Sequence, residues 1–131
     1  MKFLFVSPEA LAVDLAWKVK REGPEVLFAV VVNSEKDIGD GLLEKYDDWE
    51  AKAEWADVVV FDDVGRAAEA ERLRKKGKAV VGPTAYSDRL ELDREFGQDE
   101  MRAVGMTVLP NWAFESFDAA AAFIREKPDR Y

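Results

Sequence analysis

The chain has 131 residues, 48% of them hydrophobic, which suits one compact domain with a continuous buried core. Its 27 acidic and 19 basic residues give a net charge of -8, which argues against a nucleic-acid partner. Cys and His are both absent, and this excludes disulfides, thiolate nucleophiles, a His base and ordinary zinc sites.

The apolar runs of the chain are too short for a membrane partner. None approaches the roughly 18 to 20 residues that a membrane helix needs. The first run, residues 1–6, is interrupted at once by Ser7, Pro8 and Glu9, which is unlike a signal peptide. We therefore expect a soluble, cytoplasmic protein.

Four short apolar runs predict β-strands, and they lie at residues 2–6, 27–32, 58–61 and 79–81. They lack polar alternation, as is typical of parallel strands covered on both faces. Amphipathic helices are predicted between them. The first has the stripe Leu11, Leu15 and Val19; the second has Leu42, Tyr46, Trp49, Ala53 and Ala56; the third spans residues 65–76 and is capped by Gly77. This alternation predicts an α/β fold with an open parallel Rossmann-like sheet of about four strands and flanking helices.

The remaining residues predict a C-terminal helical appendage. A helix is expected over residues 87–104, ended by Gly105, and a short extended piece over residues 107–109. A last helix, capped by Ser116 and ending before Pro128, would turn Phe117, Ala120, Ala121 and Ile124 inward.

Polar residues follow each predicted strand, where ligands bind in open α/β sheets. They form the segments 7–9, 33–34, 62–63 and 82–84. Pro8 and Glu9 also suit the first turn of a helix, so Glu9 either complements the helix dipole or contacts a cationic or amine ligand.

The pair Asp62 and Asp63 has two interpretations. Two neighbouring carboxylates attract a divalent metal or an amine. They also precede the third predicted helix, so either one can be its N-cap.

Five aromatic residues invite a base-stacking interpretation, namely Trp17, Tyr46, Trp49, Trp55 and Trp112. Tyr46 and Trp49 lie on the inner stripe of their predicted helix, which favours packing in the core.

The segment from Val80 to Thr84, followed by Leu90, Glu91, Arg94, Phe96 and Gly105, resembles a family motif. It is similar to the G-P-S…L-E-G-S-K-x-F-A stretch that opens the ATP-grasp region of phosphoribosylamine-glycine ligases. Residues 15–18, Leu-Ala-Trp-Lys, match the same family. The resemblance implies a pre-ATP-grasp Rossmann-like domain over residues 1–105 and the start of a truncated ATP-grasp region over residues 106–131.

The resemblance also implies site residues. Gly82, Pro83 and Thr84 fall beside the family's substrate pocket, and Thr84 equally suits a helix N-cap. Arg94 falls where the family has a lysine that holds nucleotide phosphates, and its alternative is a surface pair with Glu91. The complete enzyme would use ATP and Mg²⁺ in purine biosynthesis, whereas no catalytic or metal residue and no cofactor is expected within this chain.

The first loop departs from the family, in which glycines, an Arg and a His hold a phosphate. This chain has Ser7, Pro8, Glu9 and Ala10 there, so we expect Ser7, Pro8 and Glu9 to contact a different substrate, an uncharged or cationic amine. The sequence thus predicts the substrate-side domain of an ATP-dependent carboxylate-amine ligase, inactive alone and joined to further ATP-grasp domains. The alternative is a stand-alone Rossmann-like binding domain without catalysis, and a reading frame that continues past Tyr131 would favour the ligase.

Overall fold

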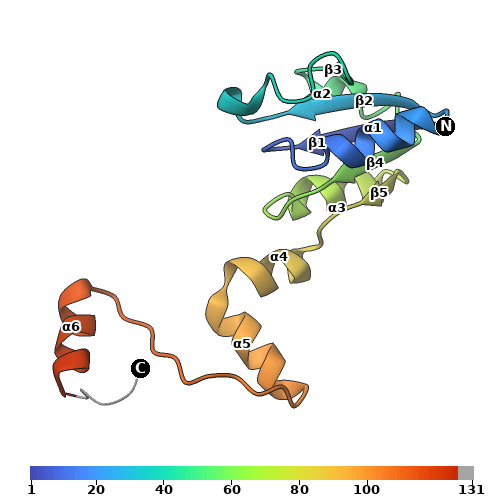
Figure 1. Ribbon diagram of the computed structural model, residues 1–131. Coiled ribbons are helices and arrows are strands. Elements are labelled where there is room, and N and C mark those ends of the chain that lie inside the picture. The colour runs from blue at the N-terminus through green and yellow to red at the C-terminus, as the bar shows by residue number, and fades with distance from the viewer. Residues whose placement is uncertain (127–131) are drawn as a thin grey trace. The chain divides into compact units, whose positions relative to one another are not determined.

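A computed structural model describes residues 1–126, and the chain divides into two compact units, Met1–Glu100 and Met101–Tyr131. The first unit holds the sheet and the second holds the last helix (Figure 1). No helix in the described part of the chain is both long and apolar enough to cross a membrane. The assignment of these parts to a pre-ATP-grasp domain and an ATP-grasp start stays a prediction.

The first unit is built on a parallel sheet of five strands in the order β3-β2-β1-β4-β5 (Figure 1). The strands are β1 (Lys2–Ser7), β2 (Glu25–Val30), β3 (Glu44–Lys45), β4 (Val58–Phe61) and β5 (Ala79–Val81). All four predicted strands are confirmed, and so is the predicted α/β class. The strand missing from the prediction is β3, a two-residue edge strand beside β2.

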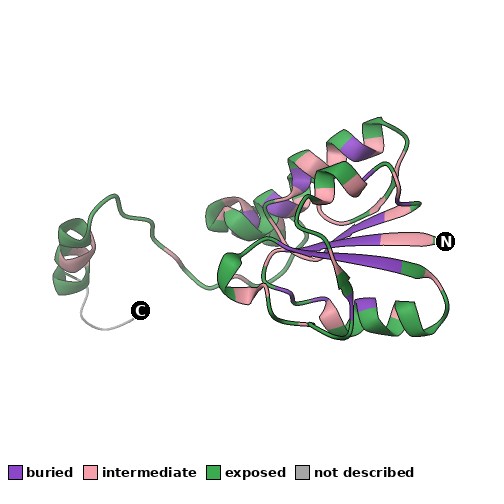
Figure 2. Ribbon diagram, turned by 90° about the horizontal axis from the view of Figure 1, so that it is seen from above, coloured by how far each residue is buried: buried purple, intermediate pink, exposed green. Residues whose placement is uncertain are grey.

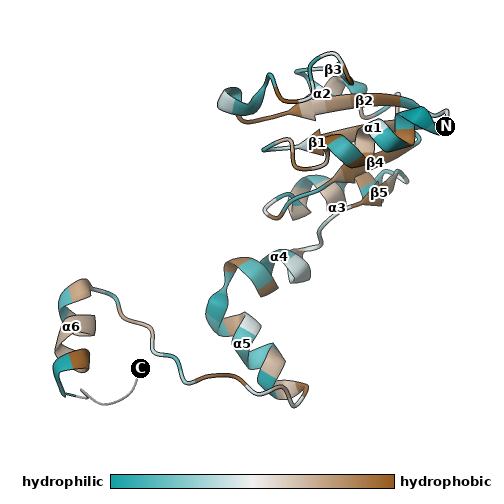
Figure 3. Cartoon of the chain, in the orientation of Figure 1, coloured by the Kyte–Doolittle hydropathy of each residue, from teal (hydrophilic) through white to brown (hydrophobic). Residues whose placement is uncertain are grey.

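Helices cover both faces of the sheet (Figure 2). On one face, α1 (Val13–Arg21) buries Ala16 against Phe5 and Phe28 of the central strands. On the other face, α2 (Trp49–Lys52) and α3 (Ala67–Lys75) pack with Leu4 and Phe61 in the second core cluster. The apolar colour along most of β1, β2 and β4 in Figure 3 follows from this burial on both sides.

The helix expected over residues 42–56 was wrong in extent. Residues 44–45 pair with β2 instead, and the helix α2 is a single turn that starts at Trp49, where the Asp48 side chain accepts a hydrogen bond from the Ala51 N–H at 3.2 Å. Trp49 packs against the core, edge-on to Phe61 with 5.5 Å between ring centroids. Tyr46 lies outside the helix and is exposed, so its predicted burial was wrong.

The predicted inner stripe of the first helix was wrong at two of its three positions, whereas Val19 does pack against the core. Leu11 precedes α1 and is 64% exposed, and Leu15 is 52% exposed. Ala12 and Ala16 occupy the buried positions, because small side chains let the helix lie close to the sheet.

The helix expected over residues 87–104 is two helices, α4 (Ala85–Leu92) and α5 (Arg94–Ala103). They are separated by Asp93, which has an extended backbone and whose Oδ1 accepts the Phe96 N–H at 3.0 Å. A carboxylate that caps the next helix ends the preceding one.

The second unit contains α6 (Phe117–Glu126), preceded by a segment without regular structure. Ser116 caps the helix as predicted, since its Oγ accepts the Ala119 N–H at 3.2 Å. Phe117 is 95% exposed, so its predicted inward position was wrong, and residues 107–109 form no strand. Phe123 is the residue that meets Trp112 and Phe114, at 5.1 and 5.2 Å between ring centroids. Pro128 lies outside the described residues.

Candidate functional site

The sheet changes direction of winding at β1. From β1 the chain proceeds outward to β2 and β3, then returns to the other side of β1 for β4 and β5. The carboxyl ends of β1 and β4 therefore border the crevice where ligands bind in open α/β sheets.

A hydrogen-bonded cluster joins these two strand ends. Ser7, the last residue of β1, is fully buried, and its hydroxyl donates to Oδ2 of Asp62, which follows β4. The same oxygen accepts the Ala12 N–H at 2.9 Å, just before α1 begins. Asp62 thus holds the first loop against the sheet. Within that loop Ala10 has a φ of 60°, a left-handed conformation that glycine adopts more readily.

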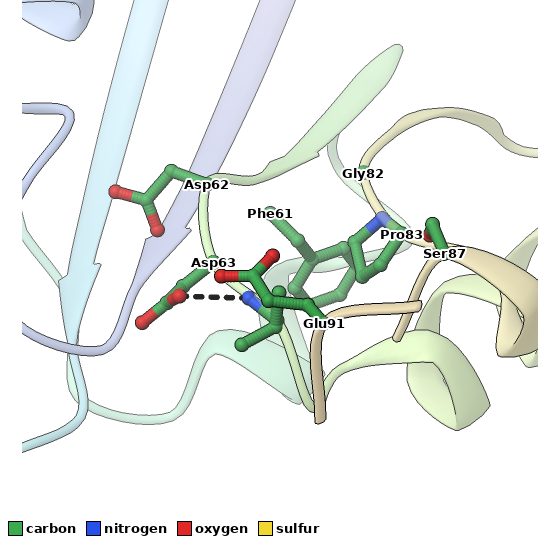
Figure 4. Close-up of a pocket in the computed structure, with 8 residues that line it drawn as sticks. Phe61, Asp62, Asp63, Gly82, Pro83, Ser87 and Glu91 are labelled. Carbon is green, nitrogen blue, oxygen red and sulfur yellow. Dashed lines mark hydrogen bonds between the residues drawn. The ribbon is translucent and has the colours of Figure 1, made fainter. Parts of the chain in front are cut away.

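An open cavity of about 400 Å³ lies next to this cluster, beyond the ends of β4 and β5 (Figure 4). Its lining comes from the end of β4, the β5–α4 loop and one side of α4. The lining residues are Phe61, Asp62, Asp63, Val64, Gly82, Pro83, Ser87 and Glu91.

Among the described residues, three carboxylates and no basic side chain line the cavity. Oδ1 of Asp63 accepts the Val64 N–H at 2.8 Å. Oδ1 of Asp62 is buried and has no hydrogen-bond partner within the described residues. The lining therefore favours a ligand that donates hydrogen bonds or carries positive charge.

The predicted N-cap role of Asp62 or Asp63 was wrong. The helix α3 begins only at Ala67, and the Ala67 N–H donates to Oδ2 of Asp88 at 2.9 Å. Asp88 belongs to α4 and is buried, so a side chain distant in sequence caps α3. The two carboxylates after β4 do not cap α3. Asp62 binds the first loop, and both residues line the cavity.

The cavity brings together two of the residues predicted to bind substrate, Gly82 and Pro83. Thr84 N-caps α4, where its Oγ1 accepts the Ser87 N–H at 3.1 Å. Ser7 is engaged with Asp62, whereas Pro8 is half-buried and Glu9 is exposed in the first loop. Direct contact of these residues with a substrate stays a prediction.

Arg94, predicted to hold nucleotide phosphates, is exposed at the start of α5. It is not among the residues that line the cavity. Its nucleotide contact also stays a prediction.

Sequence reasoning did not place Phe61, Ser87 or Glu91 in the site. The sequence pattern indicated that Phe61 is a core residue of β4. It contributes to both the core and the cavity. Ser87 and Glu91 are four residues apart on α4 and so share one face of the helix. That spacing was the available signal, but it needed the helix boundaries to be known.

The cavity does not fit the phosphates of ATP, because its carboxylates would repel them. Among the described residues, no group of three or more acidic side chains is arranged to hold a metal ion. We therefore derive no step through ATP or Mg²⁺ from this cavity.

Together, the sheet order and the strand-end cavity define a Rossmann-like α/β domain with an open cavity beyond the carboxyl ends of β4 and β5. No family model and no curated protein matches the sequence. The fold is similar to that of N5-carboxyaminoimidazole ribonucleotide synthetase from Thermotoga maritima, with a TM-score of 0.65 and 14% sequence identity. The similarity covers 95% of this chain and 36% of that chain, so this chain spans about a third of that synthetase.

Proposed function

We propose that this chain is the substrate-side domain of an ATP-dependent carboxylate-amine ligase of the ATP-grasp type. The observation that carries the proposal is the cavity at the ends of β4 and β5, on a fold shared with a ribonucleotide synthetase. The resemblance of residues 80–105 to phosphoribosylamine-glycine ligases supports the same class. Such a ligase activates a carboxylate as an acyl phosphate, which an amine then attacks.

In this proposal the cavity binds the amine. A protonated amine would find the carboxylates of Asp63 and Glu91 in the lining. The first loop has no side chain suited to a phosphate, because Glu9 would repel it and Pro8 offers no N–H. The substrate is then an amine without the family's 5'-phosphate contact at this loop.

ATP and Mg²⁺ belong to other domains of the complete protein in this proposal. Those domains would also supply the catalytic groups, since the cavity offers only the substrate side. The complete enzyme would act in the cytoplasm, with purine biosynthesis as the first pathway to test.

The test is amine-dependent ADP release by the complete product of the gene. Glycine with phosphoribosylamine is the reference pair, and a panel of other primary amines and carboxylates follows. We expect ADP release that needs both an amine and a carboxylate. A reading frame that stops after Tyr131, with a product that turns over no ATP, would instead support a binding domain without catalysis.

The first loop is tested separately by calorimetric titration with ribose 5-phosphate and with glycinamide ribonucleotide. We expect no micromolar binding that depends on this loop. Micromolar binding that survives Arg94→Ala but is lost on substitution of Ser7 or Glu9 would show that the loop does hold a phosphate.

A further inference from the structure

The β5–α4 loop forms one wall of the cavity through Gly82 and Pro83 (Figure 4). Its backbone carbonyls converge on a single side chain, that of Arg74 in α3. Arg74 Nη1 donates to the Pro83 carbonyl at 2.7 Å, and Nη2 donates to the Gly82 carbonyl at 2.8 Å and to the Val80 carbonyl at 3.4 Å.

The far end of the loop is held from the same helix. The Ala85 N–H donates to Oε1 of Glu71 at 3.1 Å. Glu71 and Arg74 are three residues apart on α3, so they share the helix face beside the loop. A contact in the opposite direction comes from Asp88 of α4, whose carboxylate accepts the Ala67 N–H at the start of α3. Three side chains therefore fasten α3, the loop and the start of α4 to one another.

The loop also has little freedom at Gly82. Its φ is +152°, and a Cβ added there would lie 2.9 Å from Cβ of Phe61, which is itself a lining residue. The backbone of Gly82 therefore lies directly against the other wall of the cavity. A small shift of this loop changes the width of the cavity.

From these contacts we propose that Arg74 is a positioning residue, which fixes the Gly82–Pro83 wall of the cavity at the distance that its ligand requires. The proposal depends on the ligase function only for the identity of that ligand. Arg74 suits this role because a planar guanidinium donates to several carbonyls at once in a fixed geometry, which a lysine ammonium does not reproduce. Arg74 itself is not among the residues that line the cavity.

A role in general stability predicts something different. Within the described residues, the hydrogen bonds of the Arg74 guanidinium go to carbonyls of residues 80–83, whereas the core strands β1 and β2 are held by their own backbone pairing and by packing. Loss of the guanidinium should therefore loosen the wall and leave the central strands unchanged. Arg72 provides a matched control, because it lies on the same helix and pairs with Glu50 on the surface at 2.9 Å.

Hydrogen exchange of the 131-residue chain, followed by NMR, tests the proposal without any ligand. In Arg74→Met we expect the amides of Ala85 and Asp88 to exchange at least tenfold faster, with β1 and β2 amides unchanged. Arg74→Lys should restore part of the protection, and Arg72→Met should change neither region. Equal acceleration in β1 and β2, or no acceleration at Ala85, would overturn the proposal.

The exchange result stands whether or not the ligase function is correct, so the two proposals fail separately. In a complete gene product that shows amine-dependent ADP release, Arg74→Lys should raise the KM for the amine several-fold and leave the KM for ATP unchanged. An unchanged KM for the amine would overturn the positioning role.

Discussion

Asp62 connects the two strand ends at the centre of the site, and its removal tests that connection. In Asp62→Ala the buried Ser7 hydroxyl and the Ala12 N–H lose their charged acceptor. Each such hydrogen bond contributes about 1.5 to 3 kcal/mol, and removing the unpartnered Oδ1 returns about 1 kcal/mol of desolvation. We therefore expect a net loss of about 2 to 5 kcal/mol in the free energy of unfolding.

The assay is urea unfolding at pH 7, followed by tryptophan fluorescence, with a double-mutant cycle. Ser7→Ala removes only one of the two donors and should cost about 1 to 2 kcal/mol. Because the double variant leaves no buried hydroxyl without a partner, its loss should be about 1 to 2 kcal/mol less than the sum of the single losses. Asp63→Ala is the control, since within the described part of the chain Asp63 accepts only the Val64 N–H, and it should cost under about 1 kcal/mol. Additive losses for Ser7 and Asp62 would show that these two side chains are not coupled.

Three further predictions concern the backbone and pH. Ala10→Gly should leave the free energy of unfolding within about 0.5 kcal/mol of the original, because the relief of backbone strain at φ 60° offsets the lost burial of a methyl group. Ala16→Gly, inside α1, should cost about 1 to 2 kcal/mol in the same urea assay. A loss as large at Ala10 would contradict the left-handed conformation. Gly82→Ala should cost about 2 to 4 kcal/mol by thermal unfolding, because its Cβ would clash with Phe61, and an unchanged Tm would show that the loop lies elsewhere. The Phe96 N–H lowers the pKa of Asp93, so the stabilisation of α5 is present above the ordinary carboxyl pKa and is lost as pH falls through the lowered one. NMR titration should find the Asp93 pKa below its ordinary value of 3.8, and a value at or above it would contradict the cap.

The four main strands could be predicted because each is a continuous apolar run between turn residues, and burial on both faces of a parallel sheet requires that pattern. The edge strand β3 could not, because Glu44 and Lys45 are polar and only their backbone pairing with β2 defines the strand. The break between α4 and α5 was missed for a similar reason. It depends on one side-chain cap at Asp93 within a sequence that otherwise favours one helix.

The position of the site could be predicted from the strand ends, but its interactions could not. Asp62 reaches Ser7 and Ala12 across 55 and 50 residues of sequence, and no local pattern reports such contacts. The capping of α3 by Asp88 likewise depends on how α4 packs beside α3. The first helix was oriented wrongly because its leucines were assumed to face the core. The helix lies close to the sheet, so the small side chains of Ala12 and Ala16 occupy the buried positions instead.

The proposal on which the function rests is that the carboxylates of the cavity bind the amine substrate of a ligase. Its most direct test compares KM values for the amine and for ATP in the complete gene product, with Asp63→Asn and Glu91→Gln as the variants. Each replaces a charged acceptor by a neutral group of the same shape, so losing about 1.4 kcal/mol or more of binding should raise the KM for the amine about tenfold or more. The KM for ATP should not change. An unchanged KM for the amine in both variants would contradict the account.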